Sequence, residues 1–200
     1  MARRAARDGS RVRRERGPRS ARVGQPRRQY GLAILSRYPI LSWTHVALPV
    51  PGSLEPRGYL AVEVEVEVEL ELEADARGVP LTFATTHFTE SDSGARARQA
   101  EHLVGLLRGV RTPTILTGDL NARPDSPEVK TLTESLVDAW LDGGTSDGFS
   151  YSASRPARRI DYVLASREFD VVRAQVVKSG ASDHLPVVAD LVLSAAERAD

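Results

Sequence analysis

Acidic, amide and imidazole side chains stand beside apolar segments at four separate places in the chain. Each residue taken singly has an ordinary interpretation, because a lone Asp beside a strand usually caps a turn and a lone His usually lies hydrogen-bonded at the surface. Three carboxylates, one amide and two imidazoles brought to one sheet edge would instead form a chemical site. The four segments are Thr86-His87, Gly118-Asp119-Leu120-Asn121, Arg159-Ile160-Asp161-Tyr162 and Ser182-Asp183-His184.

The donor types in this set favour a hard divalent cation. Carboxylate oxygens together with an Asn carbonyl suit Mg²⁺ or Mn²⁺, whereas a catalytic zinc site would need a third His or a Cys beside the two imidazoles. A Ser-His-Asp triad has candidate serines, Ser36 and Ser182 among them, but the chain has no Gly-x-Ser-x-Gly elbow. It also has no Gly-x-x-x-x-Gly-Lys-Ser/Thr loop for a nucleotide. Both of these alternatives are weak.

Several strands could position these residues. The apolar run at 31–36 predicts a buried strand that enters a turn at 37–39. Residues 61–73 alternate Val or Leu with Glu, which predicts a long strand with one face on a core and a solvated row of Glu on the other. A turn then leads to a strand at 79–86, and the pair is predicted to form a hairpin. Further strands are predicted at 112–117, which reads as fully buried, and at 160–165, 171–177 and 187–193.

Two helices are predicted between the strands. The first has apolar residues at helical spacing over 100–107, with Asp92 and Ser93 as candidate caps. The second begins at Ser126-Pro127-Glu128, which supplies an N-cap, a proline at the first helical position and an acid in the first turn. Its apolar stripe continues to Trp140. Strands near both ends with helices between them indicate sheets covered by helices.

The composition is that of a globular protein with a contrasting first segment. Residues 1–28 hold eleven of the 27 basic and two of the 27 acidic residues, which leaves a net charge of −9 on residues 29–200. So acidic a body would repel a nucleic-acid backbone over most of its surface. Residues 1–29 are nearly free of apolar side chains and are predicted to be disordered. No cysteine is present, and no apolar run is long enough to cross a bilayer. We expect a monomer located in the cytoplasm.

Six segments, in this order, resemble the endonuclease/exonuclease/phosphatase family, which includes pancreatic-type deoxyribonuclease, apurinic endonucleases, neutral sphingomyelinases and inositol-polyphosphate phosphatases. One segment alone is a weak signal, but six in order over residues 30–193 are specific. The segments are Gly31-Leu-Ala-Ile-Leu-Ser-Arg-Tyr-Pro-Ile40, Thr85-Thr-His-Phe88, Arg98-Gln99, Leu116-Thr-Gly-Asp-Leu-Asn121, Arg159-Ile-Asp-Tyr-Val-Leu164 and Ser182-Asp-His-Leu-Pro-Val187.

The resemblance implies a fold and an activity. The fold would be a four-layer α/β/β/α sandwich of two mainly antiparallel sheets, formed by a domain at 30–195 and lacking its first strands. The activity would be Mg²⁺- or Mn²⁺-dependent hydrolysis of a phosphate ester by water. The substrate would be a nucleic acid, a phospholipid head group or a small phosphoester.

Residue by residue, the resemblance also implies roles. Asp119 would align and deprotonate the water, and Asn121 would hold that water or the scissile phosphate. His184 would contact a phosphate oxygen, and Asp161 would hydrogen-bond to His184 and favour its protonated ring. His87 would be a second donor to the phosphate. Asp183 would bind the metal together with Asp119 and Asn121, while Arg57 is either a phosphate neighbour or a solvated turn residue.

The part of the family's active site that should come before residue 30 has no match in this sequence. Family members begin with a strand carrying an Asn and a later strand ending in Gln-Glu, and that Glu is a principal metal ligand. Glu15 stands in Arg-Arg-Glu-Arg without an apolar strand before it, so it does not match. We therefore favour an artefactual gene start over a basic arm for residues 1–29.

Three hypotheses follow from that mismatch. In the first, the chain is a truncated record of an active hydrolase. In the second, it is an inactive family member that kept the fold. In the third, it is a nucleic-acid-binding protein with a basic arm. For the 200 residues alone we expect weak metal binding and little hydrolysis.

Overall fold

The computed structural model describes residues 30–52, 54–68 and 77–194. The Arg-rich segment 1–29 and the end of the alternating Val/Glu stretch lie outside the described residues, so the predictions made for them are not tested. The larger sheet has the strand order β1-β2-β3-β4-β6-β5 and the smaller sheet pairs β7 with β8. The strands are β1 Ile40–Leu48, β2 Arg57–Val68, β3 Arg77–His87, β4 Thr114–Asp119, β5 Val137–Asp138, β6 Asp161–Ala165, β7 Phe169–Val176 and β8 Val187–Leu193.

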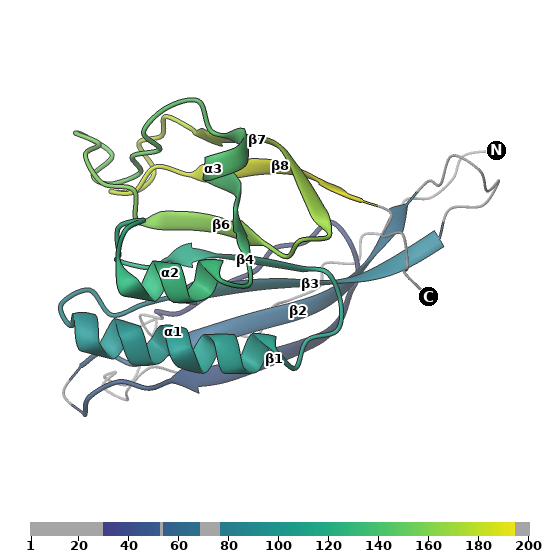
Figure 1. The fold of residues 1–200 in the computed structure, drawn as a ribbon, viewed down its shortest axis with the longest axis horizontal. Coiled ribbons are helices and arrows are strands. Elements are labelled where there is room, and N and C mark those ends of the chain that lie inside the picture. The colour runs from purple at the N-terminus through teal and green to yellow at the C-terminus, as the bar shows by residue number, and fades with distance from the viewer. Residues whose placement is uncertain (1–29, 53, 69–76, 195–200) are drawn as a thin grey trace, which may run out of the picture.

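The two sheets and three helices form layers. Helices α1 (Ser93–Leu107) and α2 (Pro127–Thr133) cover the larger sheet, while α3 (Ala139–Gly143) packs against β7 (Figure 1). Of the five strand pairings in the larger sheet, only that of β3 with β4 is parallel. The expected α/β class with two mainly antiparallel sheets is therefore confirmed.

Strand β2 shows why the chain needs both layers, because its alternate side chains enter two different cores. Tyr59 and Ala61 join the core under the helices, together with Leu103 and Leu132. The opposite face of the strand joins the core against the smaller sheet, with Leu60, Val62, Val64, Phe169, Leu191 and Leu193. Further along β2, Glu65 is exposed, as the predicted Glu row requires, and β2 and β3 form the predicted antiparallel pair.

The prediction of a strand at 31–36 is wrong. No strand is assigned there, and the first strand of the described chain is β1, at Ile40–Leu48. Ile34 is nevertheless buried and packs against the core of Leu60 and Val62, while Leu35 is 93% exposed. The apolar pattern predicted the burial of Ile34 but not the exposure of Leu35, and no described strand pairs with this segment in a ladder of hydrogen bonds.

The prediction of one helix from Ser126 to Trp140 is also wrong. Helix α2 ends at Thr133, after which Val137–Asp138 pairs with β6 and α3 begins. Asp138 causes the break because its carboxylate accepts from Trp140 N (3.0 Å) as the cap of α3 and receives Arg159 Nη1 (2.7 Å). Tertiary pairing thus overrides the helical spacing of the apolar residues.

The structure also corrects the predicted helix cap at Ser126 and the predicted bounds of the strand at 112–117. Ser126 stands at the N-cap of α2, but its hydroxyl accepts from Arg123 N instead of capping the helix. The predicted strand at 112–117 becomes β4 at Thr114–Asp119, in which only Thr114 and Leu116 are fully buried. The predicted cap Asp92 is confirmed, since its carboxylate accepts from Ala95 N at 2.8 Å.

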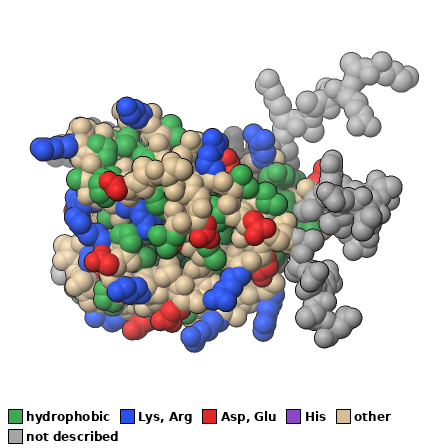
Figure 2. Space-filling view, turned by 45° about the horizontal axis from the view of Figure 1, so that its top comes forward, with side chains coloured by type: hydrophobic (Ala, Val, Ile, Leu, Met, Phe, Trp, Pro, Cys, Tyr) green, Lys and Arg blue, Asp and Glu red, His purple; other side chains and the backbone are tan. Residues whose placement is uncertain are grey.

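The surface of the described residues mixes both signs of charge. On the face shown in Figure 2, Lys and Arg side chains are interspersed with Asp and Glu side chains rather than segregated from them. None of the described helices is long and apolar enough to cross a membrane.

Candidate active site

Three candidate residues form one row across the larger sheet. His87 ends β3, and its register partner is Asp119, which ends the parallel strand β4. Asp119 in turn pairs with Asp161, which begins the antiparallel strand β6. The end of one strand and the start of its antiparallel neighbour lie at the same edge of a sheet. The topology therefore brings together residues that lie up to 74 positions apart in the sequence.

The turn after β4 positions Asp119 and Asn121. Gly118 lies so close to β3 that a Cβ there would overlap the carbonyl oxygen of Thr86. Position 118 therefore requires glycine. Asn121 adopts φ +49°, a left-handed conformation that Asn tolerates better than most residues. The Asp119 carboxylate accepts from Asn121 N at 2.8 Å. The Asn121 side-chain amide donates to Phe88 O at 3.1 Å, and its nitrogen lies 3.2 Å from His87 Nε2.

The loop after His87 is held by a buried glutamine. Gln99 of α1 is fully buried, accepts from Thr89 N (3.0 Å) and donates to the Thr89 hydroxyl (2.9 Å) and Pro49 O (3.1 Å). These bonds connect the helix to the segment that follows β3. Gln99 is one of the residues quoted for the family resemblance, and in the structure it holds Thr89, two residues after His87.

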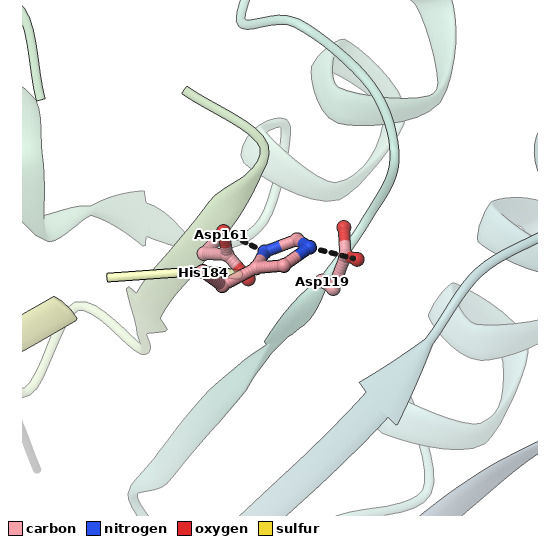
Figure 3. Close-up of side chains that lie close together, drawn as sticks. All are labelled: Asp119, Asp161 and His184. Carbon is pink, nitrogen blue, oxygen red and sulfur yellow. Dashed lines mark hydrogen bonds and ion pairs between the residues drawn. The ribbon is translucent and has the colours of Figure 1, made fainter. Parts of the chain in front are cut away.

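Asp161 and His184 form a hydrogen-bonded pair. His184 Nδ1 donates to Asp161 Oδ2 at 2.8 Å, and Ser150 Oγ donates to the same oxygen at 2.6 Å. The serine therefore contacts the carboxylate and not the imidazole. A nucleophilic triad needs the hydroxyl on the imidazole, so this trio is not one. On the other side of His184, Nε2 lies 3.8 Å from Asp119 Oδ2 (Figure 3).

Burial and neighbouring charges shift three pKa values in this row. Burial and the nearby Asp161 charge raise the pKa of Asp119 to about 6. Burial, Arg57 and His184 lower the pKa of His87 to about 4, which leaves this ring neutral at pH 7. Burial lowers the pKa of His184, but the hydrogen bond and charge of Asp161, helped by other carboxylates, outweigh burial and raise it.

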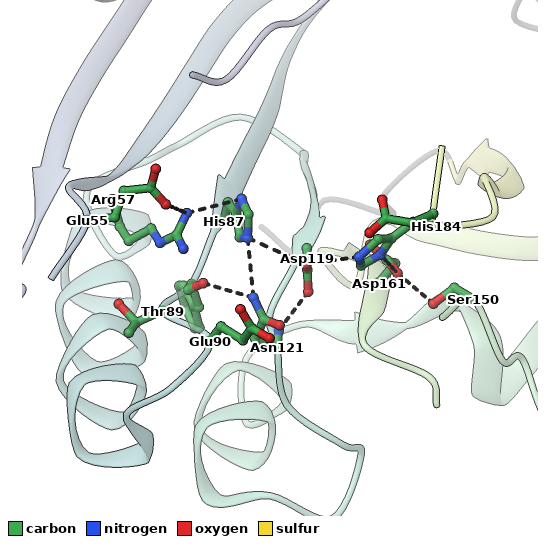
Figure 4. A network of polar contacts seen from close by, with 12 residues as sticks. Glu55, Arg57, His87, Thr89, Glu90, Asp119, Asn121, Ser150, Asp161 and His184 are labelled. Atoms are coloured by element: carbon green, nitrogen blue, oxygen red, sulfur yellow. Dashed lines mark hydrogen bonds and ion pairs between the residues drawn. The ribbon is translucent and has the colours of Figure 1, made fainter. Parts of the chain in front are cut away.

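Arg57 and Tyr30 extend the network beside His87. Arg57 Nη1 lies 2.9 Å from the Tyr30 hydroxyl. It also lies 3.4 Å from His87 Nδ1 and 3.1 Å from Glu55 (Figure 4). The Arg57 side chain is only 8% exposed, so its interpretation as a solvated turn residue is wrong. Sequence reasoning missed Tyr30 and Ser150, because both stand in irregular segments where no periodicity or motif marks them.

A group of ligand-type atoms suited to a cation lies in the same place. Among the described residues, Asp119, Asp161 and His184 offer atoms that all lie within 4.8 Å of one another. Two carboxylates fit Mg²⁺, which is typically held by one or two carboxylates with water and substrate oxygens in the other positions. Asp183 is exposed and adjoins His184 in sequence, but it is not a member of this group.

A hollow of about 330 Å³ adjoins the group on the side of the smaller sheet. Its lining includes Asp119, Asp161 and His184, together with Thr85, Thr117 and Ser182. A second hollow, of about 390 Å³, lies near the C-terminal end of α1, and none of the candidate residues lines it. The candidate chemistry therefore belongs to the first hollow.

Solved structures with a similar fold come from several organisms. A mannosyl-6-phosphatase from Bacteroides thetaiotaomicron matches with 20% identity and a TM-score of 0.64, over 78% of this chain and 67% of its own. An endonuclease/exonuclease/phosphatase from Beutenbergia cavernae matches with 29% identity and a TM-score of 0.60, over 80% of this chain and 46% of its own. The human Nocturnin catalytic domain, solved with a bound sulfate, matches with 22% identity and a TM-score of 0.61, over 79% of this chain and 61% of its own.

The sequence itself matches a family description over nearly its whole length. No curated protein matches the chain significantly. The sequence model of the endonuclease/exonuclease/phosphatase family, however, matches residues 3–184. The residues that carry the earlier resemblance from position 31 through His184 lie within that range, and the structural matches share the fold. The chain belongs to the endonuclease/exonuclease/phosphatase family.

Proposed function

We propose that this protein is a divalent-cation-dependent phosphoesterase that hydrolyses a phosphate ester by direct attack of water. The observation that carries the proposal is the row of His87, Asp119 and Asp161 at one sheet edge, completed by Asn121 and His184. Membership of a family of phosphoester hydrolases supports the same reaction class. The structural matches cover 46% to 67% of the three neighbours' lengths, so the activity of the whole protein is part of the proposal.

Asp119 is the proposed general base. A base works best when its pKa lies near the working pH, and the pKa of Asp119 is raised to about 6. Its Oδ1 accepts from Asn121 N, and its Oδ2 lies between the two imidazoles, 3.5 Å from His87 Nε2 and 3.8 Å from His184 Nε2. We assign Asn121 the role of holding the attacking water or the scissile phosphate beside this carboxylate.

His184 is the proposed cation that stabilises charge developing on a phosphate oxygen. The Asp161 carboxylate accepts from Nδ1, so a proton on Nε2 makes the ring cationic and directs that donor toward Asp119 and the hollow. An oriented donor at the position where negative charge accumulates is typically worth a factor of about 100 to 1000 in rate. Asp161 is thus a positioning residue for His184.

His87 and Arg57 form the proposed second phosphate contact. The lowered pKa of His87 keeps the ring neutral, so it donates one N–H without adding charge. Arg57 supplies a permanent positive charge next to that ring. Together the two sides of the site place donors on either side of Asp119.

Mg²⁺ is the proposed cofactor, with Mn²⁺ as a substitute, and Asp119, Asn121 and Asp183 are its proposed ligands. Asp161 belongs to the same group of ligand-type atoms as Asp119, but its Oδ2 already accepts two hydrogen bonds, so Asp161 is not among the proposed ligands. When bound, the cation would neutralise negative charge on phosphoryl oxygens and on the leaving group.

The substrate class includes nucleic acids, phospholipid head groups and small phosphoesters. One fold neighbour is a mannosyl-6-phosphatase, and another, D. rerio TDP2, was solved with a single-strand DNA product. Both phosphate monoesters and diesters therefore belong in the assay. A monomeric state and a cytoplasmic location are further predictions from the sequence.

The test measures turnover of p-nitrophenyl phosphate and bis(p-nitrophenyl) phosphate by residues 1–200. Where the reading frame extends upstream, the longer chain is assayed too. We expect Mg²⁺-dependent turnover that a chelator removes and that Asp119→Ala abolishes, with Asp147→Ala, an exposed loop carboxylate, as the matched control. Because the metal-binding Glu of the family is unmatched, turnover by residues 1–200 should be slow. The proposal would be refuted if turnover survived the chelator or the Asp119→Ala substitution. It would also be refuted if neither wild-type chain showed any turnover.

A further inference from the structure

Ser150 occupies an unusual place beside the candidate site. Its side chain is fully buried, although serine is mostly an exposed residue. The hydroxyl donates its one hydrogen to Asp161 Oδ2, with an oxygen–oxygen distance of 2.6 Å. This distance is typical of hydrogen bonds from a hydroxyl to a carboxylate, which are shorter and stronger than bonds between neutral groups.

The same carboxylate oxygen accepts from His184. Asp161 Oδ2 receives Ser150 Oγ at 2.6 Å and His184 Nδ1 at 2.8 Å. Two donors on one oxygen fix the rotation of the carboxyl group more tightly than one donor does. The plane of the carboxylate then determines the direction from which the imidazole can donate.

The backbone of Ser150 holds the other partner. Leu185 N donates to Ser150 O at 2.7 Å, and Ser150 N donates to Arg158 O at 2.9 Å. The neighbouring Tyr151 forms a β-bridge with His184, and the two ring centroids are 4.7 Å apart. Ser150 therefore holds the Asp161 carboxylate through its side chain (Figure 4), and it holds the segment that follows His184 through its main chain.

We propose that Ser150 is a positioning residue that sets the orientation of the Asp161–His184 pair through its hydroxyl. The inference rests on the proposed function for its catalytic consequence, but not for the geometry of the pair. Without the hydroxyl, Asp161 keeps one donor and its carboxyl group gains rotational freedom. His184 then spends less time with Nε2 directed toward Asp119.

Ser150→Ala tests this role because it removes the hydroxyl and leaves the backbone bonds in place. The first readout is the imidazole N–H proton signal of His184 in the NMR spectrum, assigned by its loss in His184→Ala and recorded with a chelator present. We expect this signal to broaden or disappear in Ser150→Ala and to return in Ser150→Thr, which restores a hydroxyl. Ser152→Ala is the matched control, because the Ser152 hydroxyl contacts only Ser154 in the described network, and it should leave the signal unchanged.

The second readout is catalysis by the metal-supplemented protein. We expect Ser150→Ala to lower kcat about tenfold with KM unchanged, since the lost bond involves a charged group. If neither residues 1–200 nor a longer chain has phosphoesterase activity, the proposed function fails, and the NMR signal still decides the role of Ser150. The inference is overturned if Ser150→Ala keeps the His184 signal and the kcat of Ser152→Ala. It is also overturned if Ser150→Thr folds but restores neither readout.

Discussion

The substitution Asp119→Asn removes one negative charge from a carboxyl group whose side chain is only 15% exposed. Its amide oxygen can still accept from Asn121 N, so the local turn should survive. The variant loses the proposed general base and should not hydrolyse phosphate esters. In the absence of metal, the same variant should be more stable than wild type at neutral pH.

The magnitude follows from the pKa of Asp119, raised from 3.8 to about 6. A raised pKa means that the folded chain binds more protons than the unfolded chain between about pH 4 and pH 6, so stability falls as the pH rises through that window. Each pKa unit corresponds to about 1.36 kcal/mol, which gives an upper limit of about 3 kcal/mol for the cost of ionising Asp119. His87 acts in the opposite direction, because its lowered pKa makes stability rise with pH from about 4 to 6.5.

The measurement is urea denaturation of both proteins at about pH 4 and pH 8, with a chelator present. His87 and His184 are present in both chains, but Asp119 also raises the pKa of His184. The difference between the chains therefore reports the ionisation of Asp119 together with its coupling to that ring. We expect Asp119→Asn to exceed wild type by about 2 kcal/mol at pH 8 and to match it at pH 4. Asp147→Asn, at an exposed position, should show no such change. A difference that fails to grow between the two pH values would refute the assignment of a raised pKa to Asp119.

Three further predictions concern His184, the buried ion pair and the core. His184→Ala should lower kcat at least about 100-fold in the active protein, with a urea midpoint close to that of wild type. Arg159→Met should cost about 3 to 5 kcal/mol in denaturation, because Arg159 and Asp138 are 5% and 2% exposed and Asp138 would be left unpaired. Arg173→Met, at an exposed pair, is its control and should cost less than about 1 kcal/mol. Leu103→Ala should cost about 2 to 5 kcal/mol by the same assay, since Leu103 is fully buried in the core under the helices.

Local patterns in the sequence predicted most strands and the start of each major helix. The Val/Glu alternation identified β2, because a period of two is a property of the strand itself. The strand begins at Arg57 and not at residue 61, and residues 69–73 of the prediction lie outside the described part of the chain. The prediction of a helix reaching Trp140 was wrong because its apolar residues indicated burial, and buried residues occur in an edge strand as well as in a helix. The pairing of Val137 and Asp138 with β6 depends on partners 28 and 26 residues away, and no local pattern shows it.

The candidate site divides in the same way. Asp119, Asn121, Asp161 and His184 were selected by their types and by six ordered segments, and the structure brings these four together with His87. The metal role of Asp183 stays a prediction, since this residue lies outside the compact ligand group. Ser150 and Tyr30 were missed because the contacts that bring them to the site form only after folding.

By itself, then, the sequence determined the residue types available for chemistry, the alternation that makes the strands, and the order of segments typical of the family. Only the tertiary structure decided which atoms meet. The parallel pairing of β3 with β4 and the antiparallel pairing of β4 with β6 place His87, Asp119 and Asp161 in one row. Burial in that row then shifts the pKa values of Asp119 and His87. The physical reason is that distances and desolvation depend on neighbours remote in sequence, which local spacing does not encode.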